Sequence, residues 1–284
     1  MMMKQKKPLV FSLLMLILTL TVLCVPVSAA DIQIHYVTDG LAALYEGSFN
    51  TLNGQDKSSG KWYDVSGNGN HFDLTLSEKC TWTDQGLAID SQKIILPETL
   101  LNLINGESFT VEMVLDEFVP KGKDFNTFLN NDQNDNFSLF IRVSNGELEF
   151  KNAGNTRPKA ANGRDLVNGH TVTVTFRAGG SAILYSDGQE VAKAAAASRI
   201  GAAGNFFIGH DEDSRNYSAV VKSLRFYSRD LTPEEVAANA NVTAGVTLNN
   251  IDTGDSATAW VMLSAAFCIA AMQAVTKRAG RKHG

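Results

Sequence analysis

Short runs of alternating apolar and polar residues, separated by turn residues, fill the middle of the chain. Alternation with a period of two, rich in β-branched and aromatic side chains, is typical of strands with one buried face. The predicted strands are Phe109–Leu115, Phe137–Val143, Glu147–Phe150, His170–Phe176, Ala182–Tyr185, Phe206–Gly209 and Ala219–Tyr227. In the last strand Leu224 and Phe226 alternate with Arg225 and Tyr227, which predicts one core face and one solvent face.

Turn residues separate these strands. Ser144-Asn145-Gly146 and Ser186-Asp187-Gly188 contain the Asn-Gly and Asp-Gly pairs of tight hairpins. The Ala-rich segment Ala192–Ala197 follows its hairpin so closely that we expect it to continue a strand into a loop. Many short strands with such turns predict an all-β fold, a two-sheet antiparallel sandwich.

One helix is predicted after the last strand. Thr232 suits the N-cap, Pro233 suits the first helical position, and Glu234 and Glu235 lie in the first turn, where the helix dipole favours acidic groups. The helix should end near Asn239. Residues 241–256 then lose all amphipathic pattern, so we expect a linker there.

The N-terminal end predicts secretion. Lys4, Lys6 and Lys7 precede an apolar stretch over residues 8–25, and small residues follow at Ser28, Ala29 and Ala30. This order is typical of a secretory signal peptide over residues 1–30. An uncleaved N-terminal anchor is the alternative. A lipid anchor at Cys24 is disfavoured, because the residue before it is the bulky Leu23.

The C-terminal end predicts an anchor. Residues 257–275 are apolar, and at about 1.5 Å of rise per residue a helix of this length nearly matches a hydrocarbon layer of about 30 Å. The basic segment 276–284 carries Lys277, Arg278, Arg281 and Lys282, which would hold this end on the cytoplasmic side. We therefore expect a transmembrane helix with residues 31–240 forming an extracellular domain.

Charge narrows the class of partner. Of the 25 Lys and Arg residues, three lie in residues 1–30 and four in residues 276–284, while all 30 Asp and Glu residues lie between these ends. The middle region is therefore strongly acidic, which disfavours nucleic acid and anionic lipid as partners. Cys80 is its only cysteine, so the domain must be stable without an internal disulfide.

Five segments in order resemble a known family. They are DGLAALYEG (39–47), WYDVSGNGNHFDL (62–74), SFTVEMVL (108–115), AILYSDGQEVA (182–192) and the closing stretch from Phe206 to Ala240. Together they resemble laminin-G-like, concanavalin A-like jelly rolls, which are common on bacterial surface proteins. The glycines and asparagines of SGNGN suit a tight loop, with Trp62 and Phe72 as its buried anchors.

The C-terminal end also resembles the cell-wall sorting signal of Gram-positive bacteria. Asn250-Ile251-Asp252-Thr253-Gly254-Asp255 is similar to an NPxTG or LPxTG motif, followed by the apolar span and the basic residues. The resemblance implies that a sortase cuts between Thr253 and Gly254 and links Thr253 to peptidoglycan. Ile251 stands where that family has proline, so a plain membrane anchor is the alternative.

The jelly-roll resemblance implies rim loops that hold sugars or proteins, in many members with Ca²⁺. The acidic loops are NNDQNDN (130–136) and HDEDSR (210–215), which offer the oxygen ligands that calcium prefers. The candidate ligand-binding residues are Asp132, Asp135, Asp211, Asp213 and Tyr217, and the candidate calcium site includes Asp64, Asp132, Asp135 and Asp211. Trp82, Tyr217 and Phe125 are the candidate aromatic platform for a sugar.

Catalysis is weakly supported by the sequence. Jelly-roll glucanases place paired carboxylates close together on a strand, whereas Glu112 and Asp116 lie four positions apart without that spacing. We therefore expect no catalytic residue and a non-catalytic module that binds glycan or protein at the cell surface. A structural spacer without its own ligand, and a glycoside hydrolase that uses Glu112, are the alternatives.

Overall fold

The computed structural model describes residues 31–153 and 157–249. Within them, Ile32–Asn249 form one compact unit. The predicted signal peptide, sorting motif, transmembrane helix and basic tail lie outside the described residues. Inside the described ranges, no helix combines the length and the apolar character needed to cross a bilayer.

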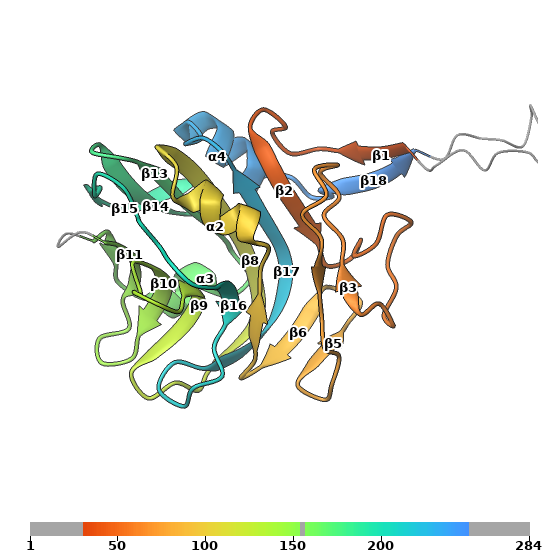
Figure 1. The fold of residues 1–284 in the computed structure, drawn as a ribbon, viewed down its shortest axis with the longest axis horizontal. Helices are drawn as coiled ribbons and strands as arrows, with labels where there is room; N and C mark the ends of the chain where they lie inside the picture. The colour runs from red at the N-terminus through yellow and green to blue at the C-terminus, as the bar shows by residue number, and fades with distance from the viewer. Residues whose placement is uncertain (1–30, 154–156, 250–284) are drawn as a thin grey trace, which may run out of the picture. The chain divides into compact units, whose positions relative to one another are not determined.

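Two antiparallel sheets form the body of the domain (Figure 1). The six-stranded sheet has the order β12 (Lys159–Ala160), β11 (Leu148–Asn152), β10 (Phe137–Arg142), β9 (Phe125–Asn131), β16 (Phe206–Gly209) and β7 (Lys93–Ile95). The eight-stranded sheet contains β15 (Gln189–Ala195), β14 (Ser181–Ser186), β13 (Thr171–Arg177), β8 (Ser108–Pro120), β17 (Tyr217–Tyr227), β6 (Leu87–Asp90) and β5 (Cys80–Trp82), with β2 (Leu41–Glu46) paired to β17. The predicted all-β sandwich is confirmed.

Smaller elements complete the unit. Two further pairs of strands are β1 (Asp31–Ile34) with β18 (Val246–Asn249) and β3 (Lys61–Trp62) with β4 (Phe72–Asp73). The helices are α2 (Glu98–Ile104), α3 (Gly163–Val167) and α4 (Pro233–Ala240). Of these helices the sequence predicted α4 alone, because α4 begins with a capping residue, Thr232, whereas α2 and α3 begin without a side-chain cap.

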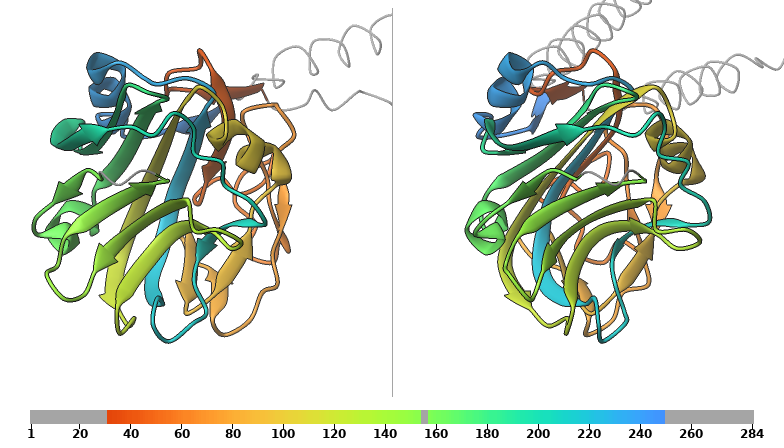
Figure 2. Two further views of the ribbon diagram at one scale, coloured as in Figure 1. Left: turned by 60° about the vertical axis from the view of Figure 1, so that its left-hand side comes forward. Right: turned by 90° about the vertical axis from the view of Figure 1, so that its left-hand side faces the viewer.

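The core lies between the two sheets, whose layering is visible edge-on in Figure 2. On β8 the alternation places Val111, Met113 and Leu115 in this core, while Thr110 and Glu112 face the other side. On β10 the same alternation buries Phe137, Leu139 and Ile141. Each large sheet therefore has an inner apolar face and an outer face with polar residues.

The predicted C-terminal helix is confirmed in detail. The Thr232 side chain accepts from the Glu235 N–H, and the Glu235 carboxylate accepts from the Thr232 N–H, which completes a capping box with Pro233 in the first turn. The linker predicted from residue 241 is wrong for Val246–Asn249, which form β18. The short strand escaped prediction because its partner, β1, lies at the other end of the domain sequence and not in a neighbouring hairpin.

The SGNGN loop is structural, as predicted. Its glycines Gly67 and Gly69 have φ values of 91° and 77°, which residues with a side chain rarely adopt. Asp64 holds the loop, because its carboxylate accepts hydrogen bonds from the N–H groups of Leu44, Ser66 and Asn70 at 3.0, 2.9 and 3.0 Å. Trp62 and Phe72 are buried in the core beside it.

Candidate functional site

The predicted acidic loop 130–136 uses its carboxylates within the protein. Asp132 accepts from the backbone N–H and the side chain of Asn205 at 2.8 and 2.9 Å and pairs with Lys93 at 3.2 Å. The hydrogen bonds from Asn205 and the charge of Lys93 lower the pKa of Asp132, although burial opposes them. Asp132 therefore links two loops, and both of its carboxylate oxygens are already bonded to Asn205 or Lys93.

The second acidic loop does not complete a metal site. Asp211 and Asp213 are exposed, and Asp213 lies 3.5 Å from Lys123. Asp64 is fully buried in its turn and bound to backbone N–H groups. In the ranges 31–153 and 157–249, no three His, Cys, Asp or Glu side chains gather as a metal-binding group. The calcium site expected from Asp64, Asp132, Asp135 and Asp211 is therefore not formed by these residues.

The three candidate platform aromatics differ in burial. Tyr217 is 1% exposed and packs edge-on against Phe128, with ring centroids 5.2 Å apart, so its predicted role as a sugar platform is wrong. Trp82 is 4% exposed and packs against Trp62. Phe125 alone is partly exposed, and it lies on the outer face of the six-stranded sheet.

That outer face carries a pocket of about 280 Å³, which we call the arginine pocket. Its lining residues come from β9, β10, β11 and the loops beside them: Phe125, Asp135, Ser138, Phe140, Arg142, Lys151, Arg157 and Arg215. The sheet register explains the gathering, since Arg142 lies opposite Phe125 and Ser138 lies opposite Lys151. Phe140 packs edge-on against Phe125 at 5.1 Å, which forms an aromatic floor.

Cations outnumber carboxylates in the arginine pocket. Four of its described lining residues are cationic and one is acidic. The Arg142 guanidinium lies 5.0 Å from the centre of the Phe125 ring, and the Arg215 guanidinium lies 5.3 Å from the same centre. Such cation–π contacts keep both arginines in place beside the aromatic floor.

Buried Glu149 supports this cluster from beneath. Arg142 donates to its two oxygens at 2.5 and 3.2 Å, and Arg157 lies 3.4 Å away. Burial alone would raise the pKa of Glu149, but the hydrogen bond from Arg142 and the charges of Arg142, Lys159 and Arg157 outweigh it and lower the pKa. Glu149 is therefore a positioning carboxylate, held ionised under its arginines.

One buried hydroxyl in the arginine pocket has no partner. Ser138 is 1% exposed, and its Oγ makes no hydrogen bond within the described structure. Asp135 Oδ1 shares this property, since Lys151 pairs with the other oxygen at 2.8 Å and Arg215 stays 3.6 Å from Oδ1. An unpaired buried polar atom costs free energy, so such atoms are commonly found where a ligand or water completes the bonding.

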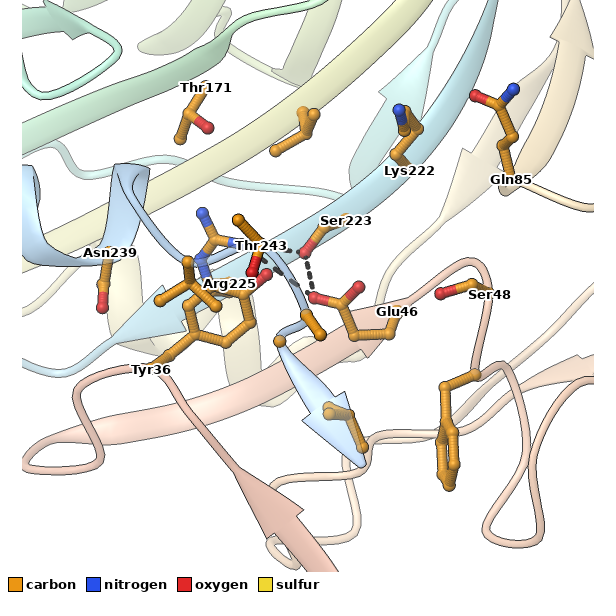
Figure 3. A pocket seen from close by; sticks show the side chains of 16 residues that line it. Tyr36, Glu46, Ser48, Gln85, Thr171, Lys222, Ser223, Arg225, Asn239 and Thr243 are labelled. Carbon is orange, nitrogen blue, oxygen red and sulfur yellow. Dashed lines mark hydrogen bonds and ion pairs between the residues drawn. The ribbon is translucent and has the colours of Figure 1, made fainter. Parts of the chain in front are cut away.

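A larger pocket, of about 330 Å³, lies on the outer face of the eight-stranded sheet (Figure 3). Beneath it Arg225, 1% exposed, donates to Glu112 Oε2 at 2.7 Å and to Ser223 Oγ at 3.0 Å. Ser223 in turn donates to Glu46 Oε1 at 2.7 Å, and the ring of Tyr36 covers the guanidinium at 4.0 Å. We call these five residues the Arg225 network.

The Arg225 network joins the ends of the domain to the sheet. Asn239 of α4 donates to Glu112 Oε2 at 2.8 Å, and its carbonyl oxygen accepts from the Val37 N–H at 2.9 Å. Burial raises the pKa of Glu46, against the lowering effect of Arg225 and Ser223. The prediction of a solvent-facing Arg225 and Tyr227 is therefore wrong, because α4 and the segment before β18 cover this face (Figure 1).

Glu112, the candidate catalytic residue of the glycoside hydrolase alternative, is fully buried in this network. It does not line the pocket above it, whereas Glu46 does. Asp116 pairs with Lys222 at 3.5 Å. The two carboxylates are thus engaged in separate ion pairs, and Glu112 has a structural position.

Sequence reasoning found Phe125 and Asp135 but missed the rest of the arginine pocket. A signal was present, because Ser138, Phe140 and Arg142 alternate within one strand and must share a face. Glu149 and Lys151 alternate in the same way on the next strand. The strand pairing that brings both sets together was not visible in the pattern.

The two antiparallel sheets define a jelly-roll protein, with a pocket on the outer face of each sheet. The profile of the concanavalin A-like lectin/glucanases superfamily (Laminin_G_3) matches residues 89–237. The chain therefore belongs to this family. A search of curated protein sequences found no match.

Solved structures give the same fold. Trypanosoma rangeli sialidase in complex with sialic acid superposes with a TM-score of 0.52 at 16% identity over 71% of this chain and 32% of that chain. The binding domain of Paraclostridial Mosquitocidal Protein 1 superposes with a TM-score of 0.51 at 16% identity over 72% of this chain and 52% of that chain. This chain thus spans about a third of the sialidase and about half of that binding domain.

Proposed function

We propose that this protein is a non-catalytic carbohydrate-binding module held at the outside of a cell. The observation that carries the proposal is the arginine pocket, where a partly exposed aromatic ring, four cations and an unpartnered buried hydroxyl converge. A few convergent polar groups in a concave site are the usual features of small-molecule recognition. The membership of a lectin-containing superfamily supports sugar as the ligand class.

Binding is favoured over the two alternatives. A spacer has no use for a concave surface on which four cations and a partly exposed aromatic ring converge. A glycoside hydrolase of the usual kind needs two carboxylates that flank the substrate bond. In the arginine pocket Asp135 is paired with Lys151, and Glu149, which lies beneath the pocket, is covered by Arg142. These pairings support recognition rather than acid–base chemistry.

Location is the second part of the proposal. The predicted signal peptide would export the domain, and the predicted helix over residues 257–275 would retain it at the membrane. If a sortase cuts between Thr253 and Gly254, the domain is instead linked to peptidoglycan. Mass spectrometry of the mature C-terminus separates these outcomes: a chain ending at Thr253 with a peptidoglycan fragment supports wall linkage, and an intact Gly284 contradicts it.

A glycan array tests the binding function. Residues 31–249, which contain the compact unit Ile32–Asn249 with its own core, would be applied to the array, because its dense display allows weak single sites to be detected. We expect retention on a subset of glycans. Silence on all glycans by the wild-type domain, with its melting temperature showing that it is folded, would contradict the proposal.

A further inference from the structure

We propose that the arginine pocket binds the negatively charged group of an acidic sugar, a carboxylate or a sulfate. The inference rests on the proposed sugar-binding function and adds the charge of the ligand and the residues that contact it. It is carried by the unequal pairing of the pocket's cations, by the unpartnered Ser138 hydroxyl and by the size of the pocket.

The cations of the arginine pocket are not equally neutralised. Arg142 is committed to Glu149 by two hydrogen bonds, and Lys151 is committed to Asp135 at 2.8 Å. Arg215, in contrast, approaches Asp135 only to 3.6 Å, which is beyond a good hydrogen bond. A guanidinium has five N–H donors, so Arg215 keeps donors for an incoming anion.

Arg157 is the second incompletely used cation. Its contact with Glu149 is 3.4 Å long, and Glu149 already accepts two bonds from Arg142. Arg142, Lys151, Arg157 and Arg215 thus face two carboxylates, Asp135 and Glu149, among the described residues. The excess positive charge stands out in a domain whose overall charge is strongly negative, so it marks a local site for an anion.

Ser138 adds a directional contact. Its Oγ is buried at the pocket wall and has no hydrogen-bond partner among the residues that the structure describes, so it can bond to a ligand without breaking a bond to any of them. A hydroxyl both donates and accepts, which suits a sugar hydroxyl or an anionic oxygen. The partly exposed Phe125 ring supplies an apolar surface beside it.

The volume limits the ligand. About 280 Å³ lies just below the range of about 300–1,000 Å³ for small-molecule pockets. One sugar ring with its charged group fits this space better than an extended chain. We therefore expect the pocket to take a terminal or branching acidic residue of a glycan.

The test compares matched pairs of immobilised sugars on the folded 31–249 domain. The carboxylate pair is glucuronic acid and glucose, and the sulfate pair is galactose 6-sulfate and galactose. We expect at least tenfold stronger binding to the acidic member of one pair, and weaker binding at high salt, because added ions screen the attraction. The pair that responds identifies the anion.

Two variants assign the site. Arg215→Gln removes the charge with little change in length, and we expect binding to fall about tenfold, as for loss of a charge-assisted hydrogen bond. Ser138→Ala should lower binding severalfold without lowering the melting temperature. Arg199→Gln is the matched control, since this exposed arginine pairs with Glu107 outside the pocket. It should bind like the wild type.

The outcomes separate the two proposals. Equal binding of the acidic and neutral members, unchanged in Arg215→Gln, would overturn the acidic ligand and leave sugar binding standing. Binding to immobilised hexaglutamate but to no sugar would contradict both and indicate an acidic peptide. Loss of affinity in Arg199→Gln equal to that in Arg215→Gln would show nonspecific charge attraction and overturn the site.

Discussion

The outer faces of the two sheets contain the same chemical groups, but their polar atoms are fully hydrogen-bonded on one sheet and only partly on the other. On the eight-stranded sheet Arg225 is buried, and its partners Glu112, Ser223 and Glu46 are bonded to it or to one another. On the six-stranded sheet the arginines are about a quarter exposed, and the buried Ser138 hydroxyl has no partner among residues 31–153 and 157–249.

The difference separates a structural contact from the proposed binding site. A fully paired buried polar network fixes one arrangement of the chain, and removing any member leaves the others unpaired. A polar cluster with surplus charge and unpaired atoms is completed only by something from outside. Completeness of hydrogen bonding, rather than pocket size, therefore distinguishes the two, since the larger pocket lies over the complete network.

The largest expected effect comes from Arg225→Met. It leaves Glu112 and Glu46 buried without their cation, which should cost about 3–5 kcal/mol in the free energy of unfolding. Urea unfolding followed by the fluorescence of buried Trp62 and Trp82 measures it. Arg142→Met is the matched variant on the other face, and its cost should be much smaller because Glu149 retains Arg157 and Lys159. If both variants lose the same free energy of unfolding, the two faces do not differ in how completely their charges are paired.

Ser223→Ala should have the next largest effect. The Ser223 hydroxyl donates to Glu46 and accepts from Arg225, so its removal leaves two buried charged groups each short of one bond. We expect a loss of about 1–3 kcal/mol in urea unfolding. A loss below about 0.5 kcal/mol would mean that water takes the place of the hydroxyl and that solvent reaches the Arg225 network.

Glu46→Gln tests the burial of charge in the network through pH. Because burial raises the folded-state pKa of Glu46, its stabilising contribution is complete below the unfolded pKa and is lost as pH rises through the folded value. The wild type should therefore lose stability relative to Glu46→Gln as pH rises from about 4.5. Melting temperatures of both proteins across this range measure it, and parallel curves would refute the raised pKa.

Ser138→Ala should have the smallest effect on stability. It removes an unpartnered hydroxyl, so the free energy of unfolding should stay within about 0.5 kcal/mol of the wild type or increase. The same substitution at Ser223 is its direct comparison. If Ser138→Ala costs as much as Ser223→Ala, the hydroxyl is already bonded and the arginine pocket is complete without a ligand.

Much of the fold was visible in the sequence, since each face of a sheet repeats every second residue. The alternation in β8, β10, β13 and β17 and the cap at Thr232 predicted their elements correctly. The alternation could not say what covers an outer face. Arg225 was expected in solvent because the residues that cover it, Tyr36 and Asn239, come from distant segments.

The site was predicted less well for the same reason. Tyr217 follows an acidic loop and was expected at the surface, but it begins β17 and shares that strand's inward face with Ala219 and Val221, so its ring lies in the core. Phe125 and Asp135 were identified from composition. Ser138 and Arg215 were not, because an unpaired hydroxyl and an incomplete ion pair are properties of the assembled sheet and its loops.

The pairing of β1 with β18 has a consequence for how the domain is made. His35 and Thr247, 212 positions apart, are joined by a 2.9 Å hydrogen bond, and the His35 N–H donates to the Gly245 carbonyl at 3.0 Å. A chain is synthesised from its N-terminus, so β1 cannot pair with β18 until nearly all of the domain has been synthesised. Closing so long a loop is slow as well as late. Until that pairing forms, Tyr36 and the segment before β18 are not held over Arg225 and its carboxylates.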